Sequence, residues 1–80
     1  MSEKEIEDII DKAKFIVSGY AFLAKEDNVS IVNLNPPHHA ALIRPNGEVL
    51  ETNMYDIELE IVLNKYWAKN KPFFFDLTYA

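Results

Sequence analysis

The sequence contains no cysteine and only two glycines. Without cysteine the chain forms no disulfide and offers no thiolate ligand to a metal ion. The two glycines, Gly19 and Gly47, lie too far apart to build a glycine-rich loop that binds phosphate through backbone amides. The lack of cysteine also fits a reducing compartment, so we expect the protein to be cytoplasmic.

Long apolar runs and an excess of basic charge are also missing. No stretch approaches the roughly 20 apolar residues of a membrane span, and the acidic start of the chain does not resemble a signal peptide. The chain has 13 acidic and 8 basic residues and a net charge of −5, whereas nucleic-acid binding requires a basic surface. We therefore expect a soluble, non-exported protein that binds neither membranes nor nucleic acid.

These absences leave the composition of one small folded domain, residues 1–80. Of its residues, 49% are hydrophobic, 26% are charged and 12% are aromatic, which is typical of a folded protein rather than a disordered one. A chain of this length buries only a limited core, so its stability depends on large side chains, a staple or a partner.

An amphipathic helix is predicted over about residues 3–18. Ser2 followed by Glu5 forms a capping-box pattern, which marks the start of a helix. Apolar residues then recur at helical spacing along the segment, with acidic residues on the opposite face. Gly19 is expected to end the helix, because glycine readily takes the left-handed conformation of a helix C-cap.

Four short strands are expected to follow, joined as two hairpins. Residues 20–24 and 29–34 flank a polar turn, and residues 39–44 and 48–51 flank the Pro45-Asn46-Gly47 turn. The predicted fold is α+β: a helix, a small antiparallel β-meander of three to four strands, and a second helix. We expect both helices on one face of the sheet and an ordered aromatic tail at the C-terminus.

The second helix, about residues 54–69, carries apolar residues on two sides, and Asn70 to Pro72 are expected to end it. Such a helix must bury both sides or expose one. The cover could be the aromatic tail, the first helix or another protein chain. Its acidic residues, Glu58 among them, are expected to be exposed to solvent. One stripe holds Met54, Ile57, Ile61 and Ala68; the other holds Tyr55, Leu59, Val62, Leu63 and Tyr66, with Trp67 at its margin.

The two-sided helix favours a non-catalytic protein-interaction or regulatory module. Exposed apolar patches on small proteins often mark interfaces, so the partner would be another protein or a second copy of the chain. This hypothesis fails if the contact side chains prove to be buried inside a monomer. The expected contact surface comprises Tyr55, Leu59, Tyr66, Trp67, Phe73, Phe74 and Phe75.

The alternative is a small-ligand or hydrolytic site at the Pro36–His39 loop. Histidine can act as a general base near neutral pH. Neighbouring residues in an extended chain point to opposite faces, so His38 and His39 cannot easily reach one ion, and we expect no metal, no cofactor and no assigned catalytic residue. The hypothesis requires a pocket that contains one of these histidines beside a second polar group such as Arg44 or Asn33.

The segment Asn35–Ala40 (NPPHHA), followed by Ala41–Ile43 and Gly47–Glu51 (GEVLE), resembles a family of small bacterial proteins of unknown function. In that family an NPPH-x-HA loop precedes a strand, a GEVLE-type hairpin and a C-terminal helix. Here the second histidine follows the first directly, and this shorter loop changes the face on which His39 lies. The resemblance implies a compact α+β domain. Some members are suspected parts of toxin–antitoxin pairs, which favours a regulatory or partner-binding role.

Overall fold

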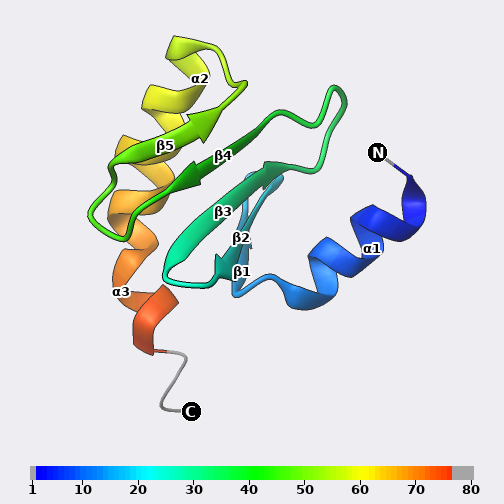
Figure 1. Cartoon of the computed structure of the whole chain (residues 1–80), viewed down its shortest axis with the longest axis horizontal. Coiled ribbons are helices and arrows are strands. Elements are labelled where there is room, and N and C mark those ends of the chain that lie inside the picture. Colours follow the sequence, from blue (N-terminus) through cyan, green and yellow to red (C-terminus); the bar gives the residue numbers. More distant parts are fainter. Residues whose placement is uncertain (1, 77–80) are drawn as a thin grey trace.

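The computed structural model describes residues 2–76, apart from the side chains of Phe73, Phe75 and Asp76. Its architecture is α+β, as predicted, with five strands where three to four were expected (Figure 1). None of the helices within residues 2–76 is long and apolar enough to cross a membrane. The elements in chain order are α1 (Glu3–Lys12), β1 (Phe15–Val17), β2 (Tyr20–Lys25), β3 (Asn28–Asn33), β4 (Ala40–Ile43), β5 (Val49–Thr52), α2 (Asp56–Ile61), the π-helical segment η1 (Val62–Trp67) and α3 (Ala68–Asp76).

The strands form one antiparallel sheet in the order β1-β2-β3-β4-β5. The predicted pairings of β2 with β3 and of β4 with β5 are both present. In the turn between β4 and β5, Gly47 has a φ of 95° and its N–H donates to the carbonyl oxygen of Arg44 at 2.8 Å. In this meander the end of each strand lies beside the start of the next, so residues that are distant in the sequence lie close together.

The first helix ends at Lys12, so its predicted extension to residue 18 was wrong. Phe15–Val17 forms β1 instead and pairs with β2. Ser18 and Gly19, with φ values of 50° and 83°, form the two-residue turn between these strands. The hydrogen bonds to β2, together with the strand preference of aromatic and β-branched side chains, outweigh the helical periodicity of this segment.

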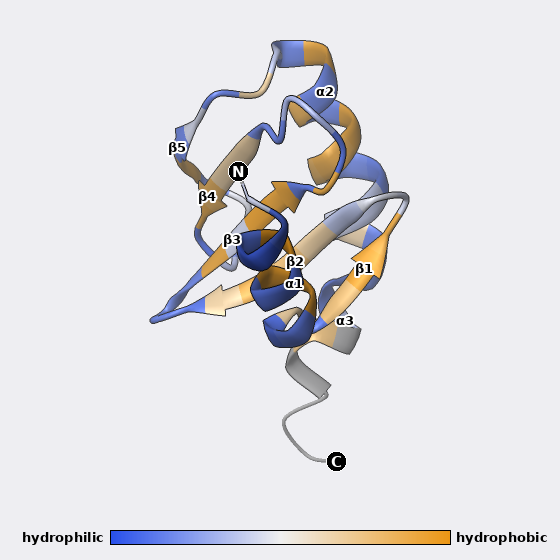
Figure 2. Cartoon of the chain, turned by 90° about the vertical axis from the view of Figure 1, so that its right-hand side faces the viewer, coloured by the Kyte–Doolittle hydropathy of each residue, from blue (hydrophilic) through white to orange (hydrophobic). Residues whose placement is uncertain are grey.

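The helices lie on opposite faces of the sheet, whereas both were predicted on one face (Figure 1). Figure 2 shows α1 in front of the sheet, with α2 and α3 behind it. Neighbouring residues of the central strands are apolar on both faces, so each face requires a cover. On the α1 side, Ala21 and Val32 pair across β2 and β3 and are buried.

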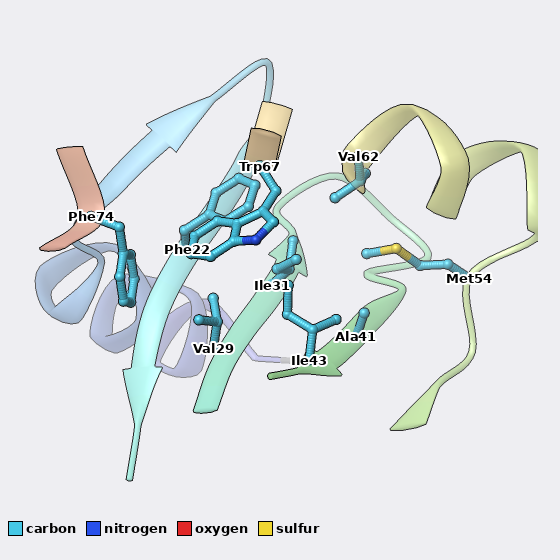
Figure 3. Close-up of a cluster of buried hydrophobic side chains, with 9 residues drawn as sticks. All are labelled: Phe22, Val29, Ile31, Ala41, Ile43, Met54, Val62, Trp67 and Phe74. Atoms are coloured by element: carbon cyan, nitrogen blue, oxygen red, sulfur yellow. The ribbon is translucent and has the colours of Figure 1, made fainter. Parts of the chain in front are cut away.

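The main core lies between the sheet and the C-terminal helical segment (Figure 3). Side chains from β2, β3 and β4 meet side chains from η1 and α3 there, and Met54 closes one end just before α2. The ring of Phe22 stacks on that of Trp67 with centroids 6.0 Å apart. The core residues are Phe22, Val29, Ile31, Ala41, Ile43, Met54, Val62, Trp67 and Phe74.

The second helix continues through Pro72 to Asp76, so the predicted end at Asn70 to Pro72 was wrong. Proline inside a helix removes a hydrogen bond and costs about 3 kcal/mol. Two helical turns bring Trp67 and Phe74 to the same face, where both are buried with ring centroids 5.3 Å apart. Their burial offsets the cost of the proline, and the first part of the expected tail is helical. Residues 77–80 of that tail lie outside the described part of the chain.

Candidate functional site

The carboxylate of Glu58 is the centre of a hydrogen-bonded cluster. Its Oε2 accepts from the Tyr20 hydroxyl at 2.8 Å and from the Asn33 side-chain amide at 3.1 Å. Its Oε1 lies 3.0 Å from Nδ1 of His39. An ionised carboxylate only accepts hydrogen bonds, so the Nδ1 atom carries the proton and donates it. These four side chains form the Glu58 cluster.

The register of the sheet brings the members of the Glu58 cluster together. Tyr20 at the start of β2 is paired with Asn33 at the end of β3. The backbone N–H of Asn33 donates to the carbonyl oxygen of His39 at 2.8 Å, which holds that residue beside β3 just before β4 begins. Glu58 in the first turn of α2 completes the cluster. Four distant parts of the sequence therefore meet at one end of the sheet.

The Pro36–His39 loop holds its two histidines in different surroundings. The Asn35 N–H donates to Oδ1 of Asn33 at 2.9 Å, and the His38 N–H donates to the Asn35 carbonyl oxygen at 2.8 Å. Nδ1 of His38 lies 3.1 Å from the backbone carbonyl oxygen of Asn33, whereas His39 belongs to the Glu58 cluster. The two rings therefore contact different groups and do not converge on one point.

A groove of about 770 Å³ borders the Glu58 cluster. This volume is within the range of about 300–1,000 Å³ that is usual for ligand pockets. The side chains of His39 and Glu58 are only 16% and 18% exposed, whereas Tyr55 and Ile57 are 75% and 74% exposed. The groove therefore has a polar inner part and an apolar outer part. It is lined by Tyr20, Pro37, His39, Tyr55, Ile57, Glu58, Ile61 and Tyr66.

Two pairs of aromatic rings line the groove. Tyr20 and Tyr66 have ring centroids 5.7 Å apart, and His39 meets Tyr55 edge to face with centroids 5.2 Å apart. One member of each pair, Tyr20 or His39, hydrogen-bonds to Glu58. Each aromatic pair therefore has one member in contact with the same carboxylate.

The cluster changes the pKa of two of its members. Burial alone would raise the pKa of Glu58, but the hydrogen bonds from Tyr20, His39 and Asn33 outweigh it and hold the pKa below its ordinary value. Burial raises the pKa of Tyr20 to about 12, and its hydrogen bond to Glu58 contributes to the rise. At neutral pH Glu58 is therefore an anion and Tyr20 a neutral donor.

The chemistry that the cluster offers is hydrogen bonding, charge and proton transfer. With Nδ1 of His39 donating to Glu58, Nε2 is the ring nitrogen that can accept a proton from a bound molecule. Within residues 2–76 no three histidine or acidic side chains lie together as metal ligands.

The Pro36–His39 hypothesis predicted a pocket that contains a histidine beside Arg44 or Asn33. The structure brings some of these residues together. His39 lines the groove, and Asn33 hydrogen-bonds to Glu58 beside it. Arg44 lies at the opposite end of β4, where its Nε is 2.7 Å from a carboxylate oxygen of Glu48. Arg44 is therefore separate from the site.

Two residues of the predicted interaction surface belong to the core instead. Trp67 and Phe74 are only 3% and 5% exposed, because the longer helix packs both against the sheet. This corrects the expectation that they face a partner. The side chains of Phe73 and Phe75, which were expected on the same surface, lie outside the described part of the structure.

The other residues of that predicted surface are divided between the groove and the core. Tyr55 and Tyr66 line the groove, and Leu59 packs against the core. The apolar residues that α2 leaves exposed are Ile57 and Ile61, which belong to the other stripe. The exposed apolar residues at this helix therefore come from both stripes, Tyr55 from one and Ile57 and Ile61 from the other.

The sequence did not single out Glu58 or Tyr20 as members of a site. Glu58 lies between the two apolar stripes of its helix. A carboxylate beside a buried stripe can be partly buried, and this position was the one feature of the sequence that could have pointed to Glu58. Tyr20 was predicted only as the first residue of a strand. No sequence pattern linked either residue to His39.

Sequence similarity places the chain in a protein family. No curated protein and no solved structure matches the chain significantly. Comparison with protein families gives a match over residues 3–74, which includes all members of the Glu58 cluster. The chain therefore belongs to DUF7723, a family of unknown function.

Proposed function

We propose that this chain is a non-catalytic recognition module whose groove binds a short segment of a partner protein. The supporting observation is the band of exposed apolar side chains, Tyr55, Ile57 and Ile61, along the groove. Exposed apolar patches are unusual on small soluble proteins and mark interaction sites. The Glu58 cluster supplies the few fixed polar groups that orient a ligand in such a groove.

A partner of different sequence fits this groove better than a second copy of the chain. Asp56 and Glu60 are exposed on α2, the helix that carries Ile57 and Glu58, and the whole chain has a net charge of −5. Two copies packed through α2 would bring these carboxylates close together, and like charges at an interface weaken binding. A segment with basic and apolar side chains would complement both the charge and the groove.

Selection from a random-peptide library tests this proposal. Peptides that bind the wild type are expected to bind Ile57→Glu at least about tenfold more weakly, because a carboxylate would replace an apolar contact at the groove. They should also shift the NMR signals of Tyr20, His39 and Tyr66.

Leu50→Glu is the matched control for this experiment. Leu50 is 41% exposed and lies on β5, outside the groove, so its substitution should leave peptide binding unchanged. A library that yields no binder, or binders that tolerate Ile57→Glu, would contradict the proposal. So would a concentration-dependent dimer in light scattering that Ile57→Glu dissociates, because a second copy would then occupy the groove.

A second candidate function is acid–base catalysis by His39, which its 3.0 Å contact with Glu58 favours. A carboxylate on Nδ1 orients an imidazole so that Nε2 can act as a general base. Among the described residues, no serine, threonine or lysine lines the groove as a nucleophile, so a hydrolytic reaction would have to use water. This candidate predicts hydrolysis of activated esters or phosphoesters that is lost in His39→Ala and kept in His38→Ala.

A further inference from the structure

We infer that the groove selects an ammonium group, and that the bound segment places a lysine-type cation beside Glu58 among the tyrosine rings. The inference rests on the proposed function, because it names the chemistry that the same groove recognises. Three features of the groove support it: its aromatic lining, the remaining capacity of the carboxylate, and the distribution of charge.

The aromatic lining suits an organic cation. Three tyrosines, Tyr20, Tyr55 and Tyr66, contribute to the groove. The face of an aromatic ring is electron-rich and attracts a cation placed within about 6 Å of the ring centroid, most strongly where water is excluded. The ring centroids are 5.7 Å apart for Tyr20 and Tyr66 and 5.2 Å apart for Tyr55 and His39, so each pair of rings is in contact. The groove of about 770 Å³ that these rings line has room for an alkylated ammonium group.

Glu58 has capacity for one more hydrogen bond. A carboxylate offers about four acceptor positions. Among the described residues, the hydroxyl of Tyr20 and the amide of Asn33 use Oε2, and only His39 uses Oε1. Oε1 can therefore accept a hydrogen bond from one further N–H. It can also form an ion pair with a methylated ammonium group, which has no N–H to donate. The three protein donors fix the carboxylate before the ligand arrives, which reduces the entropy lost on binding.

The charges around the groove also favour a cation. Among the described residues, no lysine or arginine lines the groove, and the basic group that contacts Glu58 there is His39, which is charged only when protonated. Asp56 and Glu60 on the same helix add to the negative potential, which attracts cations. An anionic ligand would be repelled, and a neutral one would gain nothing from the negative potential.

A matched pair of small probes tests the charge requirement directly. Choline and 3,3-dimethylbutan-1-ol have nearly the same shape, but only choline is charged. In NMR titrations of the isotope-labelled wild-type protein, choline is expected to bind about tenfold more tightly, with shifts at Tyr20, Tyr55 and Tyr66. Equal binding of the two probes, or no binding of choline, would overturn the inference. The peptide selection would still decide separately whether the groove is a binding site.

Peptide-borne and free ammonium groups are distinguished by further probes. N-acetyl-lysine amide and its trimethylated form carry the same group on a backbone fragment. We expect at least one of them to bind more tightly than choline, because the fragment also contacts the apolar outer part of the groove. If choline binds most tightly, a free amine is the ligand, and the assignment to a partner protein is overturned.

Two variants with the same charge change locate the cation. Glu58→Gln should reduce the preference for choline over its neutral isostere to less than about twofold. Glu60→Gln removes a charge from the same helix but outside the groove, and it should keep most of the preference. Equal losses in both variants would mean that a diffuse negative field attracts the cation, which contradicts a defined site. Tyr55→Leu should weaken choline binding without unfolding the chain, because Tyr55 is 75% exposed.

Discussion

The imidazole of His39 lies 3.0 Å from the carboxylate of Glu58, although the two residues are 19 positions apart in the sequence. This contact joins the loop before β4 to the first turn of α2, and both residues line the groove. The sequence suggested two unrelated sites, one on the second helix and one at the Pro36–His39 loop. The structure brings parts of both to the same groove, so one set of variants can test the two functional hypotheses together.

Removal of the charge of Glu58 should change how stability depends on pH. The folded protein holds the pKa of Glu58 below 4.5, so the ionised group stabilises the fold above that pH. This stabilisation is lost as the pH falls through the lowered pKa. The difference in unfolding free energy between the wild type and Glu58→Gln should therefore shrink below about pH 4.5, as measured by urea denaturation across the acidic range.

Glu60→Gln is the control for this measurement, since Glu60 is exposed on the same helix. Its stability relative to the wild type should change little over the same pH range. A difference for Glu58→Gln that stays constant from neutral to acidic pH would show that the charge of Glu58 does not stabilise the fold.

Tyr20 should ionise only in strong alkali. Its pKa is raised from 10.0 to about 12, because the folded state favours the neutral phenol. This contribution to stability is complete below about pH 10 and is lost as the pH rises towards about 12. Titration of tyrosinate by ultraviolet absorbance should show a late component in the wild type that is missing in Tyr20→Phe. If the late component disappears in Tyr55→Phe instead, Tyr20 is not the group responsible.

The sequence predicted the order of the sheet well because turn chemistry is local. Pro45-Asn46-Gly47 forms the turn between β4 and β5, and the two hairpins pair as expected. Local signals failed where tertiary packing overruled them. Gly19 is compatible with both a helix cap and a hairpin turn. It forms the turn because residues 15–17 pair with β2. Pro72 reads as a helix end, but the burial of Phe74 favours continuation.

The candidate site was only partly predictable for a related reason. His39 stood out because it follows two prolines and another histidine in a loop. Glu58 and Tyr20 are ordinary residues in their own elements, and only the register of the sheet and the start of α2 bring them to His39. A site assembled from contacts between distant segments leaves no spacing in the sequence from which it could be recognised.

Truncation of Phe74 should show that it belongs to the core. Phe74 is 5% exposed and its ring meets those of Phe15 and Trp67, so Phe74→Ala should cost about 3 kcal/mol of unfolding free energy. Ile57→Ala is the control and should cost less than about 0.5 kcal/mol, because Ile57 is 74% exposed. Urea denaturation measures both.

Phe74→Leu provides a milder test if the alanine variant does not fold. It should remain folded but less stable than the wild type, because a smaller side chain leaves part of the space empty. A variant at position 74 that is as stable as the wild type would place Phe74 outside the core. Phe74 would then again be a candidate for the surface that contacts a partner protein.

Asn33→Asp should convert a donor to Glu58 into a repelling neighbour. Asn33 donates to Oε2 of Glu58 at 3.1 Å and accepts the N–H of Asn35 through Oδ1 at 2.9 Å. Aspartate keeps the acceptor and replaces the donor with a second carboxylate. We expect a loss of about 2 kcal/mol of unfolding free energy at neutral pH, since a hydrogen bond to a charged group is lost and like charges meet.

The sign of the pH effect identifies the cause of that loss. Two close carboxylates cannot both ionise easily, so one of them has a raised pKa in the folded state. Protonation restores a donor, and Asn33→Asp should regain stability relative to the wild type as the pH falls. Asn46→Asp is the matched control, because Asn46 likewise accepts a backbone N–H, from Glu48 at 2.9 Å, but at an exposed turn. If the two aspartate variants show the same small loss at every pH, Asn33 does not support Glu58, and the carboxylate would lack the fixed geometry that selective ammonium binding requires.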